Sequence, residues 1–450
     1  MQVPERVRFI CSSLKRAGFE AWIVGGAVRD SILNREAHDF DVATNARPEQ
    51  VVKLFSHVIE TGIQHGTVTV MLEGEAYEVT TFRGEGTYSD GRHPDSVEFL
   101  NSIEEDLARR DFTMNAIAYD PLRDVVCDPF GGVFDIGVKR IRAVGVPEDR
   151  FREDGLRALR ALRFMSTLGF TIEIYTLDGI MHSDSLNSLA KVSVERVQDE
   201  LFKIMRSPQP TLAMNEMVDT RVLGVILPEM VPMVGCTQNR YHAFDVWGHT
   251  MVTLENCPAD NPILRFGALF HDVSKPETKG VHPVHGDATF YDHEIVGGKR
   301  TDEILTRMKF STGDREKIVH LVRHHFIRYE IGWSAPALRR WVRKVGLENV
   351  QTLCTLARAD IAGKGSARVE LEPATINDLE ARVASMRLTE VIPTSTKVLV
   401  INGHDVMTHL GLSPGPAIGK VLASLLESVT DDPELNTREK LLELAREVQL

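Results

Sequence analysis

The sequence lacks long hydrophobic runs and contains few cysteines. No apolar stretch in its 450 residues approaches the roughly 18 residues that a membrane-spanning helix needs, so we expect no membrane partner. The N-terminal stretch MQVPERVRFICSSLKRAGF has helical amphipathic spacing and lacks the apolar core and cleavage site of a signal peptide. The five cysteines are scattered without a CxxC pair, which predicts reduced thiols and a cytoplasmic protein.

The sequence also has no internal repeat and no low-complexity segment. Its length predicts several domains, because single hydrophobic cores seldom grow past a few hundred residues. Hydrophobic and charged contents of 43% and 26% are those of an ordinary soluble globular protein. The formal net charge of −12 neither supplies nor excludes a nucleic-acid partner, since a local basic patch can coexist with an acidic total.

The patterning divides the chain into a mixed head and a helical remainder. Within the first 145 residues we expect strands over 21–24, 40–43, 67–72, 75–82, 113–119 and 140–144, with helices over 27–33 and 48–55. From Pro147 onward the strand signals nearly vanish, and a long helix is expected over 148–168. This pattern predicts an α+β protein with an all-helical body.

Two carboxylates, Asp39 and Asp41, lie two residues apart on a predicted strand and so point to one face. Such close like charges favour a cation between them, and oxygen ligands of this kind suit Mg²⁺. Upstream, Gly25 and Gly26 end a strand and open a helix, where backbone N–H groups can hold phosphate and Arg29 can reach the same anion. A lone DxD is more often a solvated acidic strand, but this combination indicates a metal and phosphate site.

A third carboxylate on the predicted hairpin, Glu78, fits two interpretations equally. It either completes the metal site or is an exposed strand residue.

Five motifs then occur in a fixed order along the chain. They are VGGAVRD at 24–30, HDFDVAT at 38–44, RRDFTMNA at 109–116, DPFGG at 128–132 and EDGLR at 153–157. This series resembles the class II tRNA nucleotidyltransferase and bacterial poly(A) polymerase family. The resemblance implies a polymerase-β-like head with a mixed sheet, and addition of nucleotides to an RNA 3′ end without a nucleic-acid template, from CTP and ATP onto tRNA.

The resemblance also implies roles for residues of the head. Asp39 and Asp41 would hold two Mg²⁺ ions as the catalytic carboxylates, with Glu78 the candidate third. Gly25, Gly26 and Arg29 would hold the triphosphate. Arg110 and Asp111 would contact the ribose, with the aspartate accepting a hydrogen bond from the 2′-hydroxyl.

Four charged residues, Asp154, Arg157, Arg160 and Arg163, recur every three residues in the predicted helix 148–168 and would form one ridge. Three arginines in a row repel one another and favour a nearby anion. By the resemblance, Asp154 would accept from the exocyclic amino group of C or A, and Arg157 would donate to the same base edge. Arg160 and Arg163 would face phosphates. An ordinary charged helix face is the alternative.

The segment 83–95, RGEGTYSDGRHPD, resembles the loop between the metal and ribose motifs of the family. Members that stop after CC lack part of that loop, so its presence implies that A can be added. It does not separate an enzyme that adds the whole CCA end to tRNA from one that adds only the terminal A. If the segment is instead an ordinary surface loop, this inference does not hold.

A histidine-rich segment follows the head and the predicted neck. Its candidate ligands resemble those of the HD superfamily of metal-dependent phosphohydrolases; they are His249, His271, Asp272, His293, His324, His325 and Asp360. Imidazole and carboxylate ligands suit a transition metal better than Mg²⁺. His282 and His285 compete with His293 for one role. A degenerate helical scaffold remains the alternative to a hydrolase.

The predicted organisation has five parts. They are the nucleotidyltransferase head (1–145), a helical neck with the base-template motif (146–206), a helical body (207–240), an HD domain (241–365) and a helical tRNA-binding tail (366–450). In the tail region, the basic stretch 337–344 and the GLSPGPAIG break at 411–419 are candidate RNA contacts, or else a solvated helix face and a plain helix-joining turn.

Three rivals remain open at this point. A poly(A) polymerase uses the same chemistry with looser substrate choice, and an HD phosphohydrolase with a regulatory head would do its chemistry in the second half. An inactive RNA-binding scaffold is disfavoured by the intact DxD, RRD and EDxxR set. The sequence gives no indication of oligomeric state.

Overall fold

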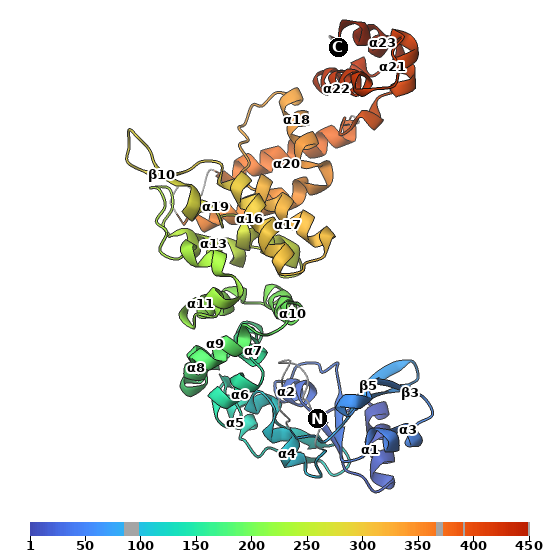
Figure 1. Cartoon of the computed structure of the whole chain (residues 1–450), viewed down its shortest axis with the longest axis vertical. Helices are drawn as coiled ribbons and strands as arrows, with labels where there is room; N and C mark the ends of the chain where they lie inside the picture. The colour runs from blue at the N-terminus through green and yellow to red at the C-terminus, as the bar shows by residue number, and fades with distance from the viewer. Residues whose placement is uncertain (85–98, 366–371, 390–391, 449–450) are drawn as a thin grey trace. The chain divides into compact units, whose positions relative to one another are not determined.

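A computed structural model of the chain describes residues 1–84, 99–365, 372–389 and 392–448 (Figure 1). The elements form two compact units, Met1–Val231 and Pro232–Leu450, which are described separately below. The finer division of the chain into five domains stays a prediction. No helix in these described ranges is long and apolar enough to cross a membrane.

The first unit contains a seven-stranded sheet in the order β3-β4-β5-β2-β1-β6-β7. β2 and β5 run parallel and the other neighbours run antiparallel, so the predicted mixed sheet is confirmed. The strands are β1 (Ala21–Val24), β2 (Asp41–Thr44), β3 (Val58–Gly62), β4 (Thr67–Leu72), β5 (Glu75–Thr81), β6 (Ala118–Asp120) and β7 (Val125–Cys127).

The β4–β5 hairpin follows directly from its turn residues. Leu72 pairs with Glu75, and the two residues between them, Glu73 and Gly74, both have positive φ angles, of 50° and 85°. A two-residue turn of this kind matches the twist of the flanking strands. The hairpin sets the register that places Glu78 beside the central strands.

Five helices surround this sheet in the first part of the chain. They are α1 (Glu5–Arg16), α2 (Gly26–Ile32), α3 (Pro48–Leu54), α4 (Ile103–Ala108) and α5 (Gly132–Gly137). The amphipathic α1 buries its apolar face, formed by Val7, Ile10, Cys11 and Leu14.

The expected strand over 113–119 is only partly present. Residues 113–115 form a 3-10 turn, in which the Thr113 hydroxyl donates to buried Asp135 at 2.7 Å. Gly132 packs on the same turn so closely that an added Cβ would lie 2.1 Å from the Thr113 carbonyl oxygen. The expected strand over 140–144 shortens to β8 (Arg140–Ile141), which pairs with β9 (Thr171–Ile172).

The single helix expected over 148–168 is wrong. The structure has α6 (Pro147–Glu153) and α7 (Leu156–Leu168), with Asp154 in extended conformation between them. At Gly155 the chain approaches α9 (Ser183–Leu189) so closely that a Cβ would lie 2.2 Å from the Leu189 amide nitrogen. Asp154 therefore does not belong to a ridge with the three arginines of α7.

The remaining helices of the first unit pack around α7. They are α8 (Ile174–Met181), α9, α10 (Val194–Met205), α11 (Pro210–Asp219) and α12 (Val222–Ile226). α7 contacts both α10 and α11, and its buried side includes Leu159 and Leu162.

Where the structure describes it, the second unit is helical apart from one short hairpin, in agreement with the predicted helical remainder of the chain. Its elements are α13 (Val246–Glu255), α14 (Pro262–Phe270), α15 (Lys275–Thr278), β10 (Lys279–Val281), β11 (Ala288–Phe290), α16 (His293–Arg307), α17 (Thr312–His324), α18 (Ala335–Val345), α19 (Val350–Gly363), α20 (Glu372–Thr389), α21 (Gly403–Leu410), α22 (Pro416–Asp431) and α23 (Arg438–Glu447). One apolar core includes Leu264, Leu353 and Leu379, and a separate one beneath α21–α23 includes Val406 and Leu425.

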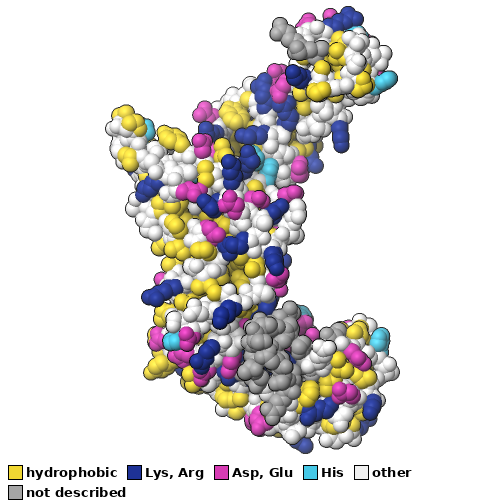
Figure 2. Space-filling model, in the orientation of Figure 1, with side chains coloured by type: hydrophobic (Ala, Val, Ile, Leu, Met, Phe, Trp, Pro, Cys, Tyr) yellow, Lys and Arg dark blue, Asp and Glu magenta, His cyan; other side chains and the backbone are white. Residues whose placement is uncertain are grey.

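The basic side chains of α18 serve mainly to hold this helix to α22. Arg339 is buried and donates to the backbone oxygens of Thr430 and Asp431, at 2.8 and 3.0 Å. Arg340 pairs with Asp431, and Arg343 pairs with Glu427. These contacts are consistent with the solvated-face alternative, and the RNA contact considered for residues 337–344 stays a prediction. Figure 2 shows basic and acidic side chains interspersed on the visible face.

Candidate active site

The first unit holds a cavity of about 330 Å³ where the sheet meets the helices after it. Its polar lining brings together residues from five parts of the sequence. They are Asp41, Glu78, Thr80, Arg83, Arg109, Arg110, Asp111, Asp154, Arg157, Arg160 and Arg196. Seven of the twelve site residues predicted for the head and neck therefore line one cavity.

Two carboxylates enter the cavity from neighbouring strands. Asp41 begins β2, and the parallel register of Val42 with Val79 brings it beside Glu78 on β5. Burial and the charge of Glu78 raise the pKa of Asp41 to about 6, although the Arg110 guanidinium opposes the shift. Clustered carboxylate oxygens with this mutual repulsion fit a divalent cation.

Asp39 lies outside the strand on which it was predicted. β2 begins at Asp41, so the alternation of a strand does not set the direction of Asp39, which is exposed and does not line the cavity. Its charge still contributes to the raised pKa of Asp41.

The glycine turn is packed against an arginine of the RRD motif. Gly25 has a φ of 74°, and a Cβ there would lie 3.2 Å from Nη1 of Arg110 and 3.8 Å from Oδ2 of Asp41. A side chain at position 25 would therefore enter the cavity. Nε of Arg110 is buried and has no hydrogen-bond partner among the described residues.

Arg29 lies close to the glycine turn but not in the cavity lining. Its guanidinium pairs with Asp30 at 2.8 Å, and Nη1 donates to the Asn115 side chain at 2.8 Å. A Cβ on Gly26 would lie 3.7 Å from Nη2 of Arg29, so the arginine covers the start of α2.

A buried aspartate that sequence reasoning missed holds the two arginines of the RRD motif. Asp106 is 1% exposed, and its carboxylate accepts from Arg109 at 2.8 Å and from Arg110 at 3.3 Å. It also accepts from the backbone N–H of Arg83 at 3.3 Å. Asp106 therefore links the RRD motif to the start of segment 83–95, of which residues 85–95 lie outside the described residues.

Asp111 and Arg160 form a buried ion pair. Oδ2 of Asp111 lies 2.8 Å from Nε and 2.7 Å from Nη2 of Arg160, while Oδ1 accepts from the Phe112 N–H and the Asn115 amide. Burial alone would raise the pKa of Asp111, but Arg160 and Asn115 outweigh it and lower the pKa to about 2. The anionic group that pairs with Arg160 in this structure is thus the Asp111 carboxylate.

Arg157 and Asp154, the two residues expected to contact the base, both make hydrogen bonds to other residues of the chain. Arg157 donates to Glu153 at 2.8 Å and to the Arg109 carbonyl oxygen at 3.1 Å. The Asp154 carboxylate is bound by both terminal nitrogens of Arg196 on α10, at 3.2 and 2.7 Å. Arg196 is a second residue that sequence reasoning missed.

Arg163 does not line the cavity. Its Nε lies 2.5 Å from buried Glu200 of α10. The expectation that Arg163 faces a phosphate therefore has no support in this arrangement.

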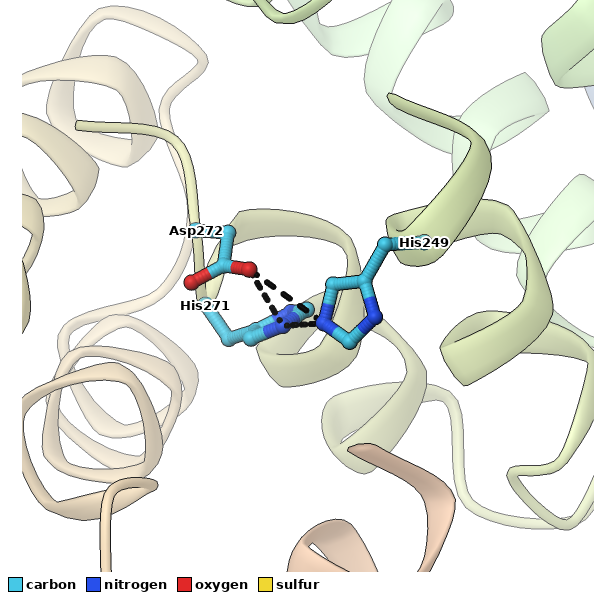
Figure 3. Close-up of side chains that lie close together, drawn as sticks. All are labelled: His249, His271 and Asp272. Carbon is cyan, nitrogen blue, oxygen red and sulfur yellow. Dashed lines mark hydrogen bonds and ion pairs between the residues drawn. The ribbon is translucent and has the colours of Figure 1, made fainter. Parts of the chain in front are cut away.

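The second unit contains a separate cluster of buried imidazoles and carboxylates. Figure 3 shows His249, His271 and Asp272 pointing toward one another, with the two Nε2 atoms 3.1 Å apart. Asp360 adds an oxygen 2.9 Å from Nε2 of His249. Oδ1 of Asp272, the oxygen farther from His249 and His271, lies 3.5 Å from Nε2 of His293.

Of the two neighbouring candidates His324 and His325, the cluster contains His325 and not His324. Nε2 of His325 lies 3.2 Å from Nε2 of His293, whereas the His324 ring lies against that of His320. Asp272 is thus shared by two groups of ligand atoms, one with His249 and His271 and one with His293 and His325. His282 and His285 stack on each other instead.

Hydrogen bonds fix the orientation of three of these rings. The Nδ1 atoms of His271, His293 and His325 lie 2.6, 2.8 and 2.7 Å from backbone carbonyl oxygens. A carbonyl oxygen can only accept, so Nδ1 carries a proton, and in the neutral ring that a metal would bind Nε2 presents a lone pair to the cluster. Second-sphere bonds of this kind orient metal-binding histidines, so the residues fit a metal.

Comparison with known proteins defines the class. Residues 21–142 match the family described as the poly A polymerase head domain, and residues 169–233 match the RNA and SrmB-binding site of polymerase A. Residues 295–445 match tRNA nucleotidyltransferase domain 2.

Individual relatives narrow the class to one family. The CCA-adding enzyme of Lactobacillus delbrueckii subsp. bulgaricus is 47% identical over 83% of this chain and 96% of that enzyme, and that of Anoxybacillus flavithermus is 32% identical over 97% and 95%. With the CCA-adding enzyme of Lactobacillus johnsonii the 49% identity spans 47% of this chain and 52% of that enzyme.

A solved structure agrees with this result. The CCA-adding enzyme of Bacillus stearothermophilus in complex with CTP has a TM-score of 0.71 and 30% identity, covering 99% of this chain and 98% of that one. The chain belongs to the family of CCA-adding enzymes, and the predicted class II tRNA nucleotidyltransferase is confirmed.

Proposed function

We propose that the first unit adds CCA to the 3′ end of tRNA from CTP and ATP without a nucleic-acid template. The observation that supports this most is that Asp41 and Glu78 share one cavity with Asp154 and Arg157. One group offers oxygen ligands for a metal and triphosphate, and the other offers an acceptor and a donor for a base edge.

Asp41, Glu78 and Asp39 would hold Mg²⁺. When bound, Mg²⁺ supplies charge stabilisation at the triphosphate and lowers the pKa of a coordinated hydroxyl. Arg110 and Arg29, with the glycine turn at Gly25 and Gly26, would bind the triphosphate oxygens. The partnerless Nε of Arg110 offers one donor for such an oxygen.

Base choice would come from hydrogen-bond complementarity. Asp154 accepts from the amino group of C or A, and Arg157 donates to the adjacent ring nitrogen. U and G present an oxygen to the carboxylate and an N–H to the arginine, which leaves buried charges unpaired and disfavours both bases.

The proposed ribose contact requires an exchange of partners at Asp111. Both of its oxygens already accept two hydrogen bonds or ion-pair contacts. For Asp111 to accept from a 2′-hydroxyl, Arg160 would have to release one of its contacts. Arg160 lines the cavity and could then donate to the same ribose.

Incorporation assays would separate this function from its rivals. Purified protein is incubated with tRNAs that end before CCA or after CC, and with an unstructured RNA, each with CTP or ATP. We expect complete CCA on the first tRNA and A on the second. Terminal A alone would identify an A-adding enzyme, and long A tails would identify a poly(A) polymerase.

The metal assignment has its own control. Asp41→Ala should lower incorporation by at least about a thousandfold, because a ligand of the reacting groups is lost. Glu60→Gln, an exposed strand residue away from the cavity, should leave incorporation unchanged. Activity that survives Asp41→Ala would refute the metal assignment.

We propose a second function for the second unit: binding of one or two divalent transition-metal ions and hydrolysis of a phosphate ester at a nucleotide or RNA end. The supporting observation is the buried set of four imidazoles around Asp272 and Asp360. Burial alone would lower the pKa of His271, but Asp272 and Asp360 raise it to about 10. This point of the cluster therefore favours positive charge, as a bound cation would supply.

Adjacent histidines provide a matched test of this metal site. After loading with Mn²⁺, Ni²⁺ or Zn²⁺, His325→Ala should lower the bound metal and the phosphatase turnover, while His324→Ala should retain both. Equal metal content in the two variants would contradict the site. Metal without turnover would leave a metal-stabilised scaffold and refute the hydrolase.

A further inference from the structure

The side chain of Asp154 has almost all of its hydrogen-bonding capacity in use. Oδ1 accepts from the Leu156 N–H at 3.0 Å and from Arg196 at 3.2 Å. Among the described residues, Oδ2 accepts from Arg196 alone, at 2.7 Å. An ionised carboxylate has about four acceptor positions, so one position, on Oδ2, is left.

That remaining position has the right character for the proposed base contact. Asp154 lines the cavity and its side chain is 17% exposed. Because the carboxylate is held in place, its open acceptor position has a fixed direction. A bidentate arginine fixes the plane of a carboxylate as well as its charge. An ionised carboxylate accepts hydrogen bonds and has no proton to donate to the oxygen of U or G.

We propose that Arg196 is a specificity-determining positioning residue: it locks Asp154 as an acceptor with a single open position, and so enforces the choice of C and A over U and G. The proposal rests on the proposed reading of the base by Asp154. Both terminal nitrogens of Arg196 lie on that carboxylate, so we assign Arg196 an action through Asp154.

Arg196 and Asp154 come from different elements. Arg196 belongs to α10, whereas Asp154 lies in the short link between α6 and α7. The backbone of Asp154 is hydrogen-bonded to Arg150 and Arg157, but among the described residues its carboxylate is held by the Leu156 N–H and Arg196 alone. Without Arg196 the carboxylate would be free to rotate, and the base edge would be read less strictly.

The test compares kcat/KM for CTP with kcat/KM for UTP on a tRNA that lacks CCA. For Arg196→Gln we expect the ratio of the two to fall by at least about tenfold, since a misplaced acceptor no longer penalises the oxygen of U. Arg206→Gln, at the exposed end of the same helix, is the matched control and should keep the wild-type ratio. Arg196→Lys, which retains the charge but not the bidentate geometry, should give an intermediate ratio.

The outcomes distinguish this proposal from the proposed reading of the base by Asp154, on which it rests. If Asp154→Ala lowers the ratio but both Arg196 variants keep it while losing overall activity, Arg196 is only structural and the proposal is wrong. If Asp154→Ala also keeps the ratio, the base is not read by Asp154 and both proposals fail. Thermal unfolding would show whether Arg196→Gln folds. If it does not fold, the comparison is made with Arg196→Lys instead.

Discussion

At the scale of single residues, the candidate site is built from ion pairs between partly buried arginines and carboxylates of the same chain. The pairs are Arg157 with Glu153, Arg160 with Asp111, Arg163 with Glu200 and Arg196 with Asp154. Such pairs hold donors and acceptors in place before a ligand arrives, which lowers the reorganisation that binding requires. The charges of the site therefore balance locally, whatever the net charge of the chain.

The ion pair between Asp111 and Arg160 should make a contribution to the free energy of unfolding that is lost in acid. The pKa of Asp111 lies at about 2, below its ordinary value of 3.8, so the unfolded chain binds the proton first as pH falls. The stabilisation is present above about pH 4 and is lost as pH falls toward 2, a change of about 2 kcal/mol in the free energy of unfolding.

Urea unfolding of the wild type and Asp111→Asn over this pH range would measure the effect. The variant should be less stable near pH 5 and should lack this part of the acid dependence. Asp149→Asn removes an exposed pair with Arg152 and should change the acid dependence little. Identical pH profiles for wild type and Asp111→Asn would contradict the account.

The sequence left the role of Glu78 open, and the structure favours a functional one. Glu78 lines the cavity beside Asp41. Glu78→Gln should lower kcat for nucleotide addition by at least about tenfold, because a carboxylate ligand of the metal is lost. Glu75→Gln, on the same strand but paired with Arg6 at the surface, should retain kcat. Equal kcat in the two variants would make Glu78 an ordinary strand residue.

The histidine set shows where residue-level prediction reaches its limit. His324 and His325 are neighbours at the end of α17, and spacing along the sequence gives no way to choose between them. Successive helical residues differ by about 100° in direction, so only one of the two can face the cluster. The choice depends on how α17 packs on its neighbours, which is set by contacts far away in the sequence.

At the scale of elements, the break between α6 and α7 is the feature that positions Asp154 and Arg157, the two residues proposed to read the base. Gly155→Ala should destabilise the first unit by about 2 kcal/mol or more, because a Cβ would lie 2.2 Å from the Leu189 amide nitrogen. It should also raise KM for CTP by displacing Asp154. Gly137→Ala, where nothing lies within 4 Å of the added Cβ, is the control and should be tolerated. Equal thermal unfolding of the two variants would contradict the proposed packing.

Element-level prediction worked where local signals determine the structure. The β4–β5 hairpin follows from a two-residue turn and has its predicted bounds to within one residue. The amphipathic spacing of residues 1–19 predicted a helix, and α1 forms within that stretch, over Glu5–Arg16. The break at residues 154–155 could not be seen, because helical periodicity continues through it and the cause is a close approach of α9. The same holds for Arg196, which lies 42 residues from Asp154.

At the scale of the whole molecule, two units carry two separate sets of chemical groups. Carboxylates and arginines converge in the first, and imidazoles with two aspartates converge in the second. The α+β head and the helical remainder followed from the disappearance of strand signals near Pro147. The residues that tune each site come from long-range packing, and these were the ones that the sequence did not reveal.

The central claim is that a carboxylate pair and a base-reading pair act on one nucleoside triphosphate in a single cavity. The most direct measurement is a crystal structure of the protein with CTP and Mg²⁺. The account predicts a cation bound by Asp41, with the cytosine amino group on Asp154 and its ring nitrogen facing Arg157. A cation elsewhere, or a base bound away from residues 154 and 157, would contradict it.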